Sequence, residues 1–226
     1  MANLLIIDTA LEEAIVALSK DGKIVAELTN KETYSHASFI QVAIANLLAE
    51  QQVAISELDA IAVTLGPGSY TGLRVGLATA KGIAYSLQKP LIGLSTLSAL
   101  TFAAIKQAPK VPEAPIQIFA MIDARRMEVF GAIYDASCNP ILQEQAMVLD
   151  QAKWNSLIYQ PTLCIGNGLA KTKEFISPYK VTYLNETYTS QDLHELALIK
   201  FNAAQFEDLA YVGPNYLKDV YILPSK

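Results

Sequence analysis

The chain of 226 residues carries 22 acidic and 17 basic residues, a net charge of −5, and 52% of it is hydrophobic. This hydrophobic content supports a buried core and excludes a disordered chain. No stretch approaches the roughly 20 apolar residues of a membrane-spanning helix. A protein that holds RNA on its own usually needs a basic surface, so the acidic balance disfavours primary tRNA binding.

The chain has two cysteines, Cys138 and Cys164, and a core of this size needs no disulfide, so we expect reduced thiols. The opening MANLLIIDTA lacks the charged n-region of a signal peptide and places Asp8 where a signal peptide needs apolar residues. We therefore expect a cytoplasmic protein with no membrane attachment.

The first half of the chain predicts a regular order of elements. Strands are expected at 4–9, 13–19, 23–29, 60–65 and 90–94, and helices at about 36–51, 73–87 and 96–106. An Asp21-Gly22 pair forms a tight turn between the second and third strands. The order β-β-β-α-β-α-β-α is that of the ribonuclease-H/actin-like unit, in which helices cover both faces of one mixed sheet.

The second half predicts a shortened copy of this unit, although no sequence repeat is visible. Residues 107–115 contain three prolines and read as a linker, which divides the chain into 1–106 and 107–226. Strands are expected at 116–122, 128–134, 162–166 and near 181–184, with helices from about Ala170 and at about 191–206. The region 137–160 gives no clear pattern. The predicted fold is α/β and actin-like (ASKHA, ribonuclease-H-like), with two subdomains that each hold a mixed sheet flanked by helices.

A glycine-rich segment, GPGSYTGLR, joins the fourth strand to the second helix. Free backbone N–H groups at such a place bind anions, and glycine lets the backbone approach a ligand closely. The spacing matches neither a P-loop nor the dinucleotide fingerprint. Two interpretations stay open: a structural turn in which Ser69 or Thr71 caps the helix, or a contact to a phosphate or a partner. The candidate residues are Gly66, Gly68, Ser69, Thr71 and Gly72.

Two acidic residues stand at strand ends. In actin-like ATPases and sugar kinases, a carboxylate at the position of Asp8 faces the metal-bound nucleotide, but it can equally close the turn. The stretch 10–22 offers only Gly22 for a phosphate loop, which argues against independent nucleotide chemistry. Asp123, with Arg125 and Arg126, either faces a cleft or forms a solvated turn with a local ion pair.

The chain has two histidines, His36 and His194. A histidine pair four residues apart on one helix would suit a metal, but Ile40 stands four residues after His36. His194 lies in an amphipathic helix and is expected at its surface. No G-x-S-x-G nucleophile elbow occurs. We predict no catalytic residue, cofactor or metal site.

Both of the first two helices have an outward face without charge. Opposite the core stripe Ile40, Ile44, Leu47 and Leu48, the first helix carries Val42, Ala45 and Ala49. Opposite Leu73, Leu77, Ala80, Ala84 and Leu87, the second carries Val75, Ala78, Thr79, Gly82 and Ser86. A helical glycine costs about 1 kcal/mol relative to alanine, and small residues let another helix approach closely. Other parts of this chain or a partner subunit can cover these faces; we favour a partner.

Several segments together resemble the TsaB (YeaZ) family over the whole length. They are LLIIDTA, LGPGSYTGLRVGLATAKGIA, GLSTLSAL, IDARRMEVF and GPNYLKD. The resemblance implies an actin-like fold related to TsaD. In that system TsaD holds a metal through histidines and transfers a threonylcarbamoyl group from threonylcarbamoyl-AMP to N6 of adenosine 37 in tRNAs that read ANN codons. TsaE supplies an ATPase, and TsaB docks its N-terminal helices on TsaD without catalysis of its own.

The resemblance implies a non-catalytic scaffold or activator subunit. TsaD is the expected main partner, and TsaE is expected to join through the complex. A homodimer is expected when TsaD is absent, and the chain is expected to contact tRNA only indirectly. Whether a nucleotide binds at the TsaD interface stays open. The expected interface residues are His36, Val42, Ala45, Ala49, Arg74, Val75, Ala78, Thr79, Gly82 and Ser86. The alternative is an actin-like enzyme with its own nucleotide- or metal-dependent activity, kinase-like or peptidase-like.

Overall fold

The computed structural model describes residues 2–31, 36–108 and 117–218. They form two compact units, Met1–Ala103 with Tyr188–Pro214, and Ala104–Thr187 with Asn215–Lys226. The division at residues 106 and 107 expected from the sequence does not include this return of residues 188–214 to the first unit. Most of the proposed linker 107–115 lies outside the described residues.

The first unit is built on a mixed five-stranded sheet in the order β3-β2-β1-β4-β5. Its strands are β1 (Leu4–Asp8), β2 (Ala14–Lys20), β3 (Lys23–Asn30), β4 (Ala60–Gly66) and β5 (Leu91–Ser95). β1, β2 and β3 pair antiparallel, whereas β1, β4 and β5 pair parallel. Its helices are α1 (His36–Glu50), α2 (Tyr70–Leu87), most of α3 (Thr96–Gln107) and α5 (Ser190–Asn202), with a short 3-10 turn, η2 (Ile55–Glu57).

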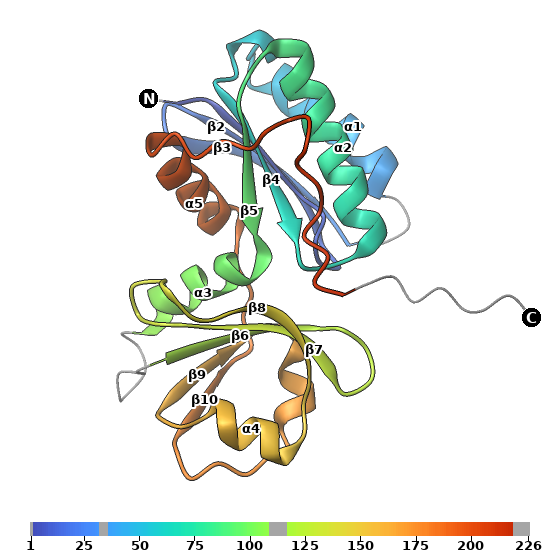
Figure 1. Ribbon diagram of the computed structural model, residues 1–226. Coiled ribbons are helices and arrows are strands. Elements are labelled where there is room, and N and C mark those ends of the chain that lie inside the picture. The colour runs from blue at the N-terminus through green and yellow to red at the C-terminus, as the bar shows by residue number, and fades with distance from the viewer. Residues whose placement is uncertain (1, 32–35, 109–116, 219–226) are drawn as a thin grey trace, which may run out of the picture. The chain divides into compact units, whose positions relative to one another are not determined.

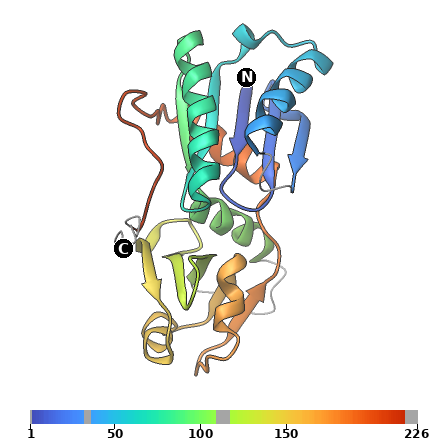
Figure 2. The ribbon, with the colours of Figure 1, turned by 90° about the vertical axis from the view of Figure 1, so that its right-hand side faces the viewer.

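Helices cover both faces of this sheet, with α1 and α2 side by side on one face and α5 on the other (Figures 1 and 2). Ile40, Ile44 and Leu47 of α1 pack with Leu77 of α2 against buried β-strand side chains such as Ile7. This packing confirms the predicted core stripes of both helices, because the 3.6-residue period places those positions on one side.

The second unit repeats the same topology. Its strands are β6 (Gln117–Asp123), β7 (Glu128–Tyr134), β8 (Pro140–Val148), β9 (Thr162–Ile165) and β10 (Val181–Leu184). Their order is β10-β9-β6-β7-β8, so β8, β7, β6, β9 and β10 correspond in turn to β3, β2, β1, β4 and β5. β6, β7 and β8 are antiparallel and β6, β9 and β10 parallel, as in the first unit. The duplicated mixed sheet confirms the actin-like fold class.

Two segments of the second unit differ from the sequence expectation. β8 and α4 (Gln151–Leu157) occupy the region that gave no pattern. β8 is an edge strand with one fully buried side chain, Met147, so its period-2 signal is faint. The prediction of a helix from about Ala170 is wrong, because the chain forms a 3-10 helix, η4 (Asn167–Thr172), at this place.

No helix among the described residues is long and apolar enough to cross a bilayer.

Candidate functional site

The glycine-rich segment begins α2. β4 ends at Gly66, and Ser69 caps the helix by accepting a hydrogen bond from the backbone N–H of Gly72 at 3.2 Å. The backbone N–H of Ser69 donates to the Ala10 carbonyl at 2.8 Å. Thr71 is exposed on the first turn. Of the two capping candidates, Ser69 is therefore the cap.

The glycines of this segment let it pack against the backbone that follows β1. A Cβ atom on Gly68 would lie 2.2 Å from the Ala10 carbonyl oxygen, and one on Gly72 would lie 2.2 Å from the Thr9 carbonyl oxygen. Gly66 has a φ of 114°, which side chains rarely allow. The Thr9 hydroxyl donates to the Gly72 carbonyl at 2.7 Å. These contacts favour the structural interpretation of the segment.

Asp8 lies at the end of β1 inside a buried polar cluster. Its carboxylate is 1% exposed. One oxygen accepts from the Thr64 hydroxyl at 2.6 Å and from the Ala10 backbone N–H at 2.9 Å, and the other accepts from the Tyr188 hydroxyl at 2.8 Å. Asp8 thus closes the turn after β1 and binds two side chains within the same unit, which leaves it little access to a ligand.

Tyr188 was missed in the sequence. It stands just before α5, 180 residues from its partner Asp8, in a segment with no periodic pattern. Burial, followed by the charge and the hydrogen bond of Asp8, raises the pKa of Tyr188 well above its ordinary value. The phenol therefore stays protonated at neutral pH and remains a donor to the carboxylate.

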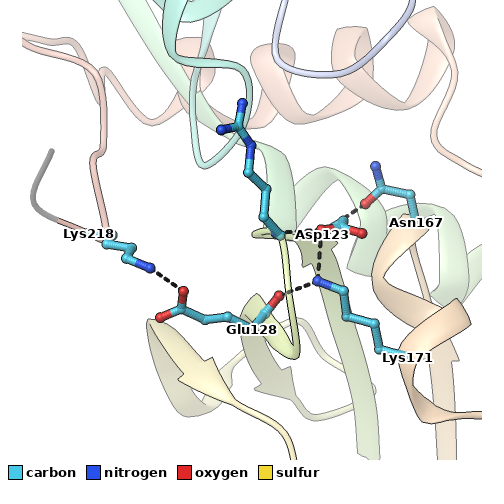
Figure 3. A network of polar contacts seen from close by, with 6 residues as sticks. Asp123, Glu128, Asn167, Lys171 and Lys218 are labelled. Atoms are coloured by element: carbon cyan, nitrogen blue, oxygen red, sulfur yellow. Dashed lines mark hydrogen bonds and ion pairs between the residues drawn. The ribbon is translucent and has the colours of Figure 1, made fainter. Parts of the chain in front are cut away.

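Asp123 lies at the centre of a second, exposed network (Figure 3). Its carboxylate accepts from the Arg125 backbone N–H at 2.6 Å and from Lys171 Nζ at 2.8 Å. Lys171 also donates to the Glu128 carbonyl at 2.6 Å, and the Asp123 backbone N–H donates to the Asn167 side chain at 2.8 Å. Partial burial raises the pKa of Asp123, but the hydrogen bonds from Lys171 and Arg125 and the charge of Lys171 outweigh it and lower the pKa.

The ion pair of this turn is therefore made by Lys171, and the adjacent Arg125 contributes its backbone. Lys218 forms an ion pair with the Glu128 carboxylate in the same network (Figure 3). The sequence did not point to Lys171, Asn167 or Lys218, because they reach the turn only after β9 has paired with β6 and residues 215–218 have returned to the second unit.

The predicted interface residues lie mostly on the exposed sides of α1 and α2. We define the α1–α2 surface by its exposed members, Val42, Ala45, Ala49, Ala78, Gly82, Tyr85 and Ser86. Val42 is 58% and Tyr85 78% exposed, and a Cβ atom on Gly82 would meet nothing within 4 Å. Tyr85 was missed, although it lies three residues after Gly82 on the same side of α2.

The remaining predicted interface residues lie beside this surface. Thr79 is half-buried and accepts from the Gln41 side chain of α1 at 3.1 Å. Arg74 is exposed, with its guanidinium 4.1 Å from the centre of the Tyr70 ring. Val75 was expected to face outward but is half-buried against the core, because it lies at the margin of the apolar stripe. His36 is the first residue of α1, and its side chain is outside the described part of the structure.

His194 is buried, at 1% exposure, which corrects the prediction of a surface residue. α5 lies on the sheet, and Ser190, Leu193, His194 and Ala197 form its buried stripe at helical spacing. Neither ring nitrogen has a hydrogen-bond partner among the described residues. Burial lowers the pKa of His194, and the charge of Glu195 offsets part of this effect. The described residues contain no cluster of three or more His, Cys, Asp or Glu side chains that suits a metal.

Stability is expected to fall as the pH drops from about 7.5 through the ordinary histidine pKa of about 6.5 and on toward the lower pKa of folded His194. The pKa of His194 is lower in the folded than in the unfolded chain, so the unfolded chain takes up the proton first, near pH 6.5, and the loss continues down to the folded pKa. The slope per histidine is at most about 1.4 kcal/mol per pH unit.

Urea unfolding of wild type and His194→Leu across this range measures the effect. The leucine variant should lose part of the slope, whereas His36→Gln, which removes the other histidine, should keep it. An unchanged slope in His194→Leu would contradict this assignment.

Comparison with known proteins agrees with the fold and the motifs. The family model "TsaD: tRNA N6-adenosine threonylcarbamoyltransferase" matches residues 10–222. The protein named "tRNA threonylcarbamoyladenosine biosynthesis protein TsaB" of Haemophilus influenzae is 37% identical over 96% of this chain and 93% of its own length. The chain belongs to the TsaB (YeaZ) family. The TsaB protein of Escherichia coli is 35% identical, over 61% of this chain and 57% of its own length.

A solved TsaB-family structure supports the same assignment. "YeaZ from Pseudomonas aeruginosa" has a TM-score of 0.77 and 27% identity, and the match covers 96% of this chain and all of the other. The curated TsaB relatives are named for the biosynthesis of tRNA threonylcarbamoyladenosine. This outcome confirms the family resemblance seen in the motifs.

Proposed function

We propose that the chain is a non-catalytic scaffold or activator subunit for the formation of N6-threonylcarbamoyladenosine at position 37 of ANN-decoding tRNAs. It acts in the cytoplasm by binding a TsaD-type transferase through the α1–α2 surface. TsaE joins through the resulting complex, and the same surface forms a homodimer when TsaD is absent. The names of its relatives support the pathway, and the α1–α2 surface supports the role within it.

The observation that carries the binding role is the chemistry of the α1–α2 surface. It spans two adjacent helices, and its members are small or apolar residues apart from the phenol of Tyr85 and the hydroxyl of Ser86, with the exposed Arg74 of α2 beside it. Gly82 lowers the intrinsic stability of α2, yet a Cβ atom there would meet nothing within 4 Å, so packing within the chain does not require a glycine at this position. Small residues at three- and four-residue spacing let the backbone of a partner helix come close, while Val42 and Tyr85 supply apolar contact area.

The buried state of Asp8 supports a non-catalytic role. A carboxylate that acts on a metal-bound nucleotide needs access to it, whereas Asp8 is buried and accepts hydrogen bonds from Thr64, Ala10 and Tyr188. Gly68 and Gly72 of the glycine-rich segment likewise pack closely against the backbone of Ala10 and Thr9. Both motifs that an actin-like enzyme would use for nucleotides thus take part in internal packing.

Gly82→Arg and Ala78→Arg are each expected to abolish co-purification with TsaD and to leave the fold intact. Both positions are exposed, so the long side chain fits the free chain but blocks the approach of a partner helix. Ile199→Arg serves as the matched control, because Ile199 is 56% exposed on α5, on the opposite face of the sheet. Normal recovery of TsaD with the Gly82 variant would remove the interface assignment.

The pathway is tested by depletion of the protein followed by nucleoside mass spectrometry of bulk tRNA. We expect threonylcarbamoyladenosine to fall and unmodified adenosine at the same position to rise. Re-expression of the wild-type chain should restore the modified nucleoside, and the Gly82→Arg variant should not. Unchanged threonylcarbamoyladenosine after depletion would exclude the proposed function.

A further inference from the structure

The turn between β6 and β7 presents two arginines on a strained but well-supported backbone. Arg125 and Arg126 have φ values of 68° and 47°, and both are exposed. Side chains other than glycine, asparagine and aspartate seldom adopt this left-handed conformation. The turn nevertheless holds two long cationic residues in succession, and such strain persists only where the surroundings stabilise it.

Hydrogen bonds within the backbone and with Asp123 and Lys171 hold the turn in this conformation. The Ala124 N–H donates to the Glu128 carbonyl at 3.0 Å, and the Glu128 N–H donates to the Arg125 carbonyl at 3.1 Å. The Asp123 carboxylate accepts from the Arg125 N–H, and Lys171 joins that carboxylate to the Glu128 carbonyl (Figure 3). The backbone at Arg125 is therefore held in place before any ligand arrives.

The two guanidinium groups carry the uncompensated charge of this turn. The carboxylates next to them already have cations, because Asp123 pairs with Lys171 and Glu128 pairs with Lys218. Neither guanidinium forms an ion pair within the part of the chain that the structure describes. In a chain of net charge −5, the β6–β7 turn is thus a local site of positive charge.

We propose that Arg125 and Arg126 bind the phosphate backbone of the tRNA on which the complex acts. The proposal rests on the proposed function, and it revises the expectation that this chain contacts tRNA only indirectly. Arginine has a planar array of donors that matches phosphate oxygens, and it is less strongly hydrated than lysine. Two such groups add to a binding surface supplied mainly by a partner, which agrees with the acidic composition of the chain.

The test compares the double variant Arg125→Gln/Arg126→Gln with wild type, each in complex with TsaD. Binding of an unmodified ANN-decoding tRNA is followed by fluorescence anisotropy at several salt concentrations. At about 0.1 M salt we expect the dissociation constant to rise on the order of tenfold. The slope of log K against log salt should become shallower by about 2, since each lost phosphate contact removes about one unit.

Lys20→Gln/Lys23→Gln is the matched control. It removes two exposed lysines from the β2–β3 hairpin of the first unit and changes the net charge equally. Equal weakening by the control would show a bulk charge effect and overturn the proposal, as would unchanged tRNA affinity in the arginine variant. Loss of TsaD binding with retained tRNA affinity would assign the turn to an acidic protein surface instead.

The same titration on the isolated chain at lower salt separates this proposal from the proposed function. If wild type does not bind TsaD, the proposed function fails, and the tRNA affinities of the isolated wild-type and variant chains still decide the role of the arginines. A clear loss in the arginine variant supports the phosphate contact, and equal affinity for tRNA excludes it.

Discussion

Gly68→Ala is expected to destabilise the protein by about 3 kcal/mol or more, the upper range for overpacked positions. The added Cβ would lie 2.2 Å from the Ala10 carbonyl oxygen, 2.9 Å from its carbon and 3.0 Å from its Cα. All three atoms belong to the backbone, so no side chain can rotate away. The segment must move, and the hydrogen bond from the Ser69 N–H to Ala10 would be lost with it. Urea unfolding measured by circular dichroism gives the change in free energy.

Gly82→Ala is the control, because the same substitution has the opposite expected sign. Gly82 lies inside α2, where a Cβ atom would meet nothing within 4 Å. Alanine there should stabilise the isolated chain by up to about 1 kcal/mol, through helix propensity and the lower entropy of the unfolded chain. A Gly68→Ala variant as stable as wild type would show that close packing on Ala10 does not explain the glycine.

Much of the fold follows from local sequence patterns. The strands of the first unit were predicted within a few residues because each is a short apolar run bounded by turns. The exposed sides of α1 and α2 were predicted because a 3.6-residue period fixes which positions share a face. Sequence patterns do not predict β8, because this edge strand buries only Met147 and so shows little alternation of apolar and polar residues.

The candidate sites were less predictable, because they depend on contacts between distant segments. The parallel register of β1 and β4, with Ile7 opposite Val63, brings Asp8 close to Thr64, and no local pattern reports that register. Lys171 reaches Asp123 across 48 residues. His194 had a usable signal, because its spacing from Ser190 and Ala197 places it on the buried side of α5. Its polar ring favoured the surface interpretation instead.

Tyr188→Phe is expected to destabilise the protein by about 1.5–3 kcal/mol, the range for a hydrogen bond to a charged group. The substitution keeps the aromatic ring and removes the hydroxyl that donates to Asp8 at 2.8 Å. The carboxylate stays buried with Thr64 and Ala10 as donors, so one oxygen loses a partner that water cannot readily replace. Urea unfolding measures the loss. Hydrogen exchange should rise first in α5, because Tyr188 begins the segment that returns to the first unit.

Tyr211→Phe controls for the chemistry of the substitution, since Tyr211 is 88% exposed and should change stability by less than about 0.5 kcal/mol. A double-mutant cycle with Asp8→Asn then isolates the pair, because a real contact makes the two single effects non-additive. Additive effects would mean that the Tyr188 hydroxyl does not stabilise the protein through Asp8. A coupling of about 1 kcal/mol or more would instead show that Asp8, which an actin-like enzyme would direct at a nucleotide, here holds the returning C-terminal segment in place.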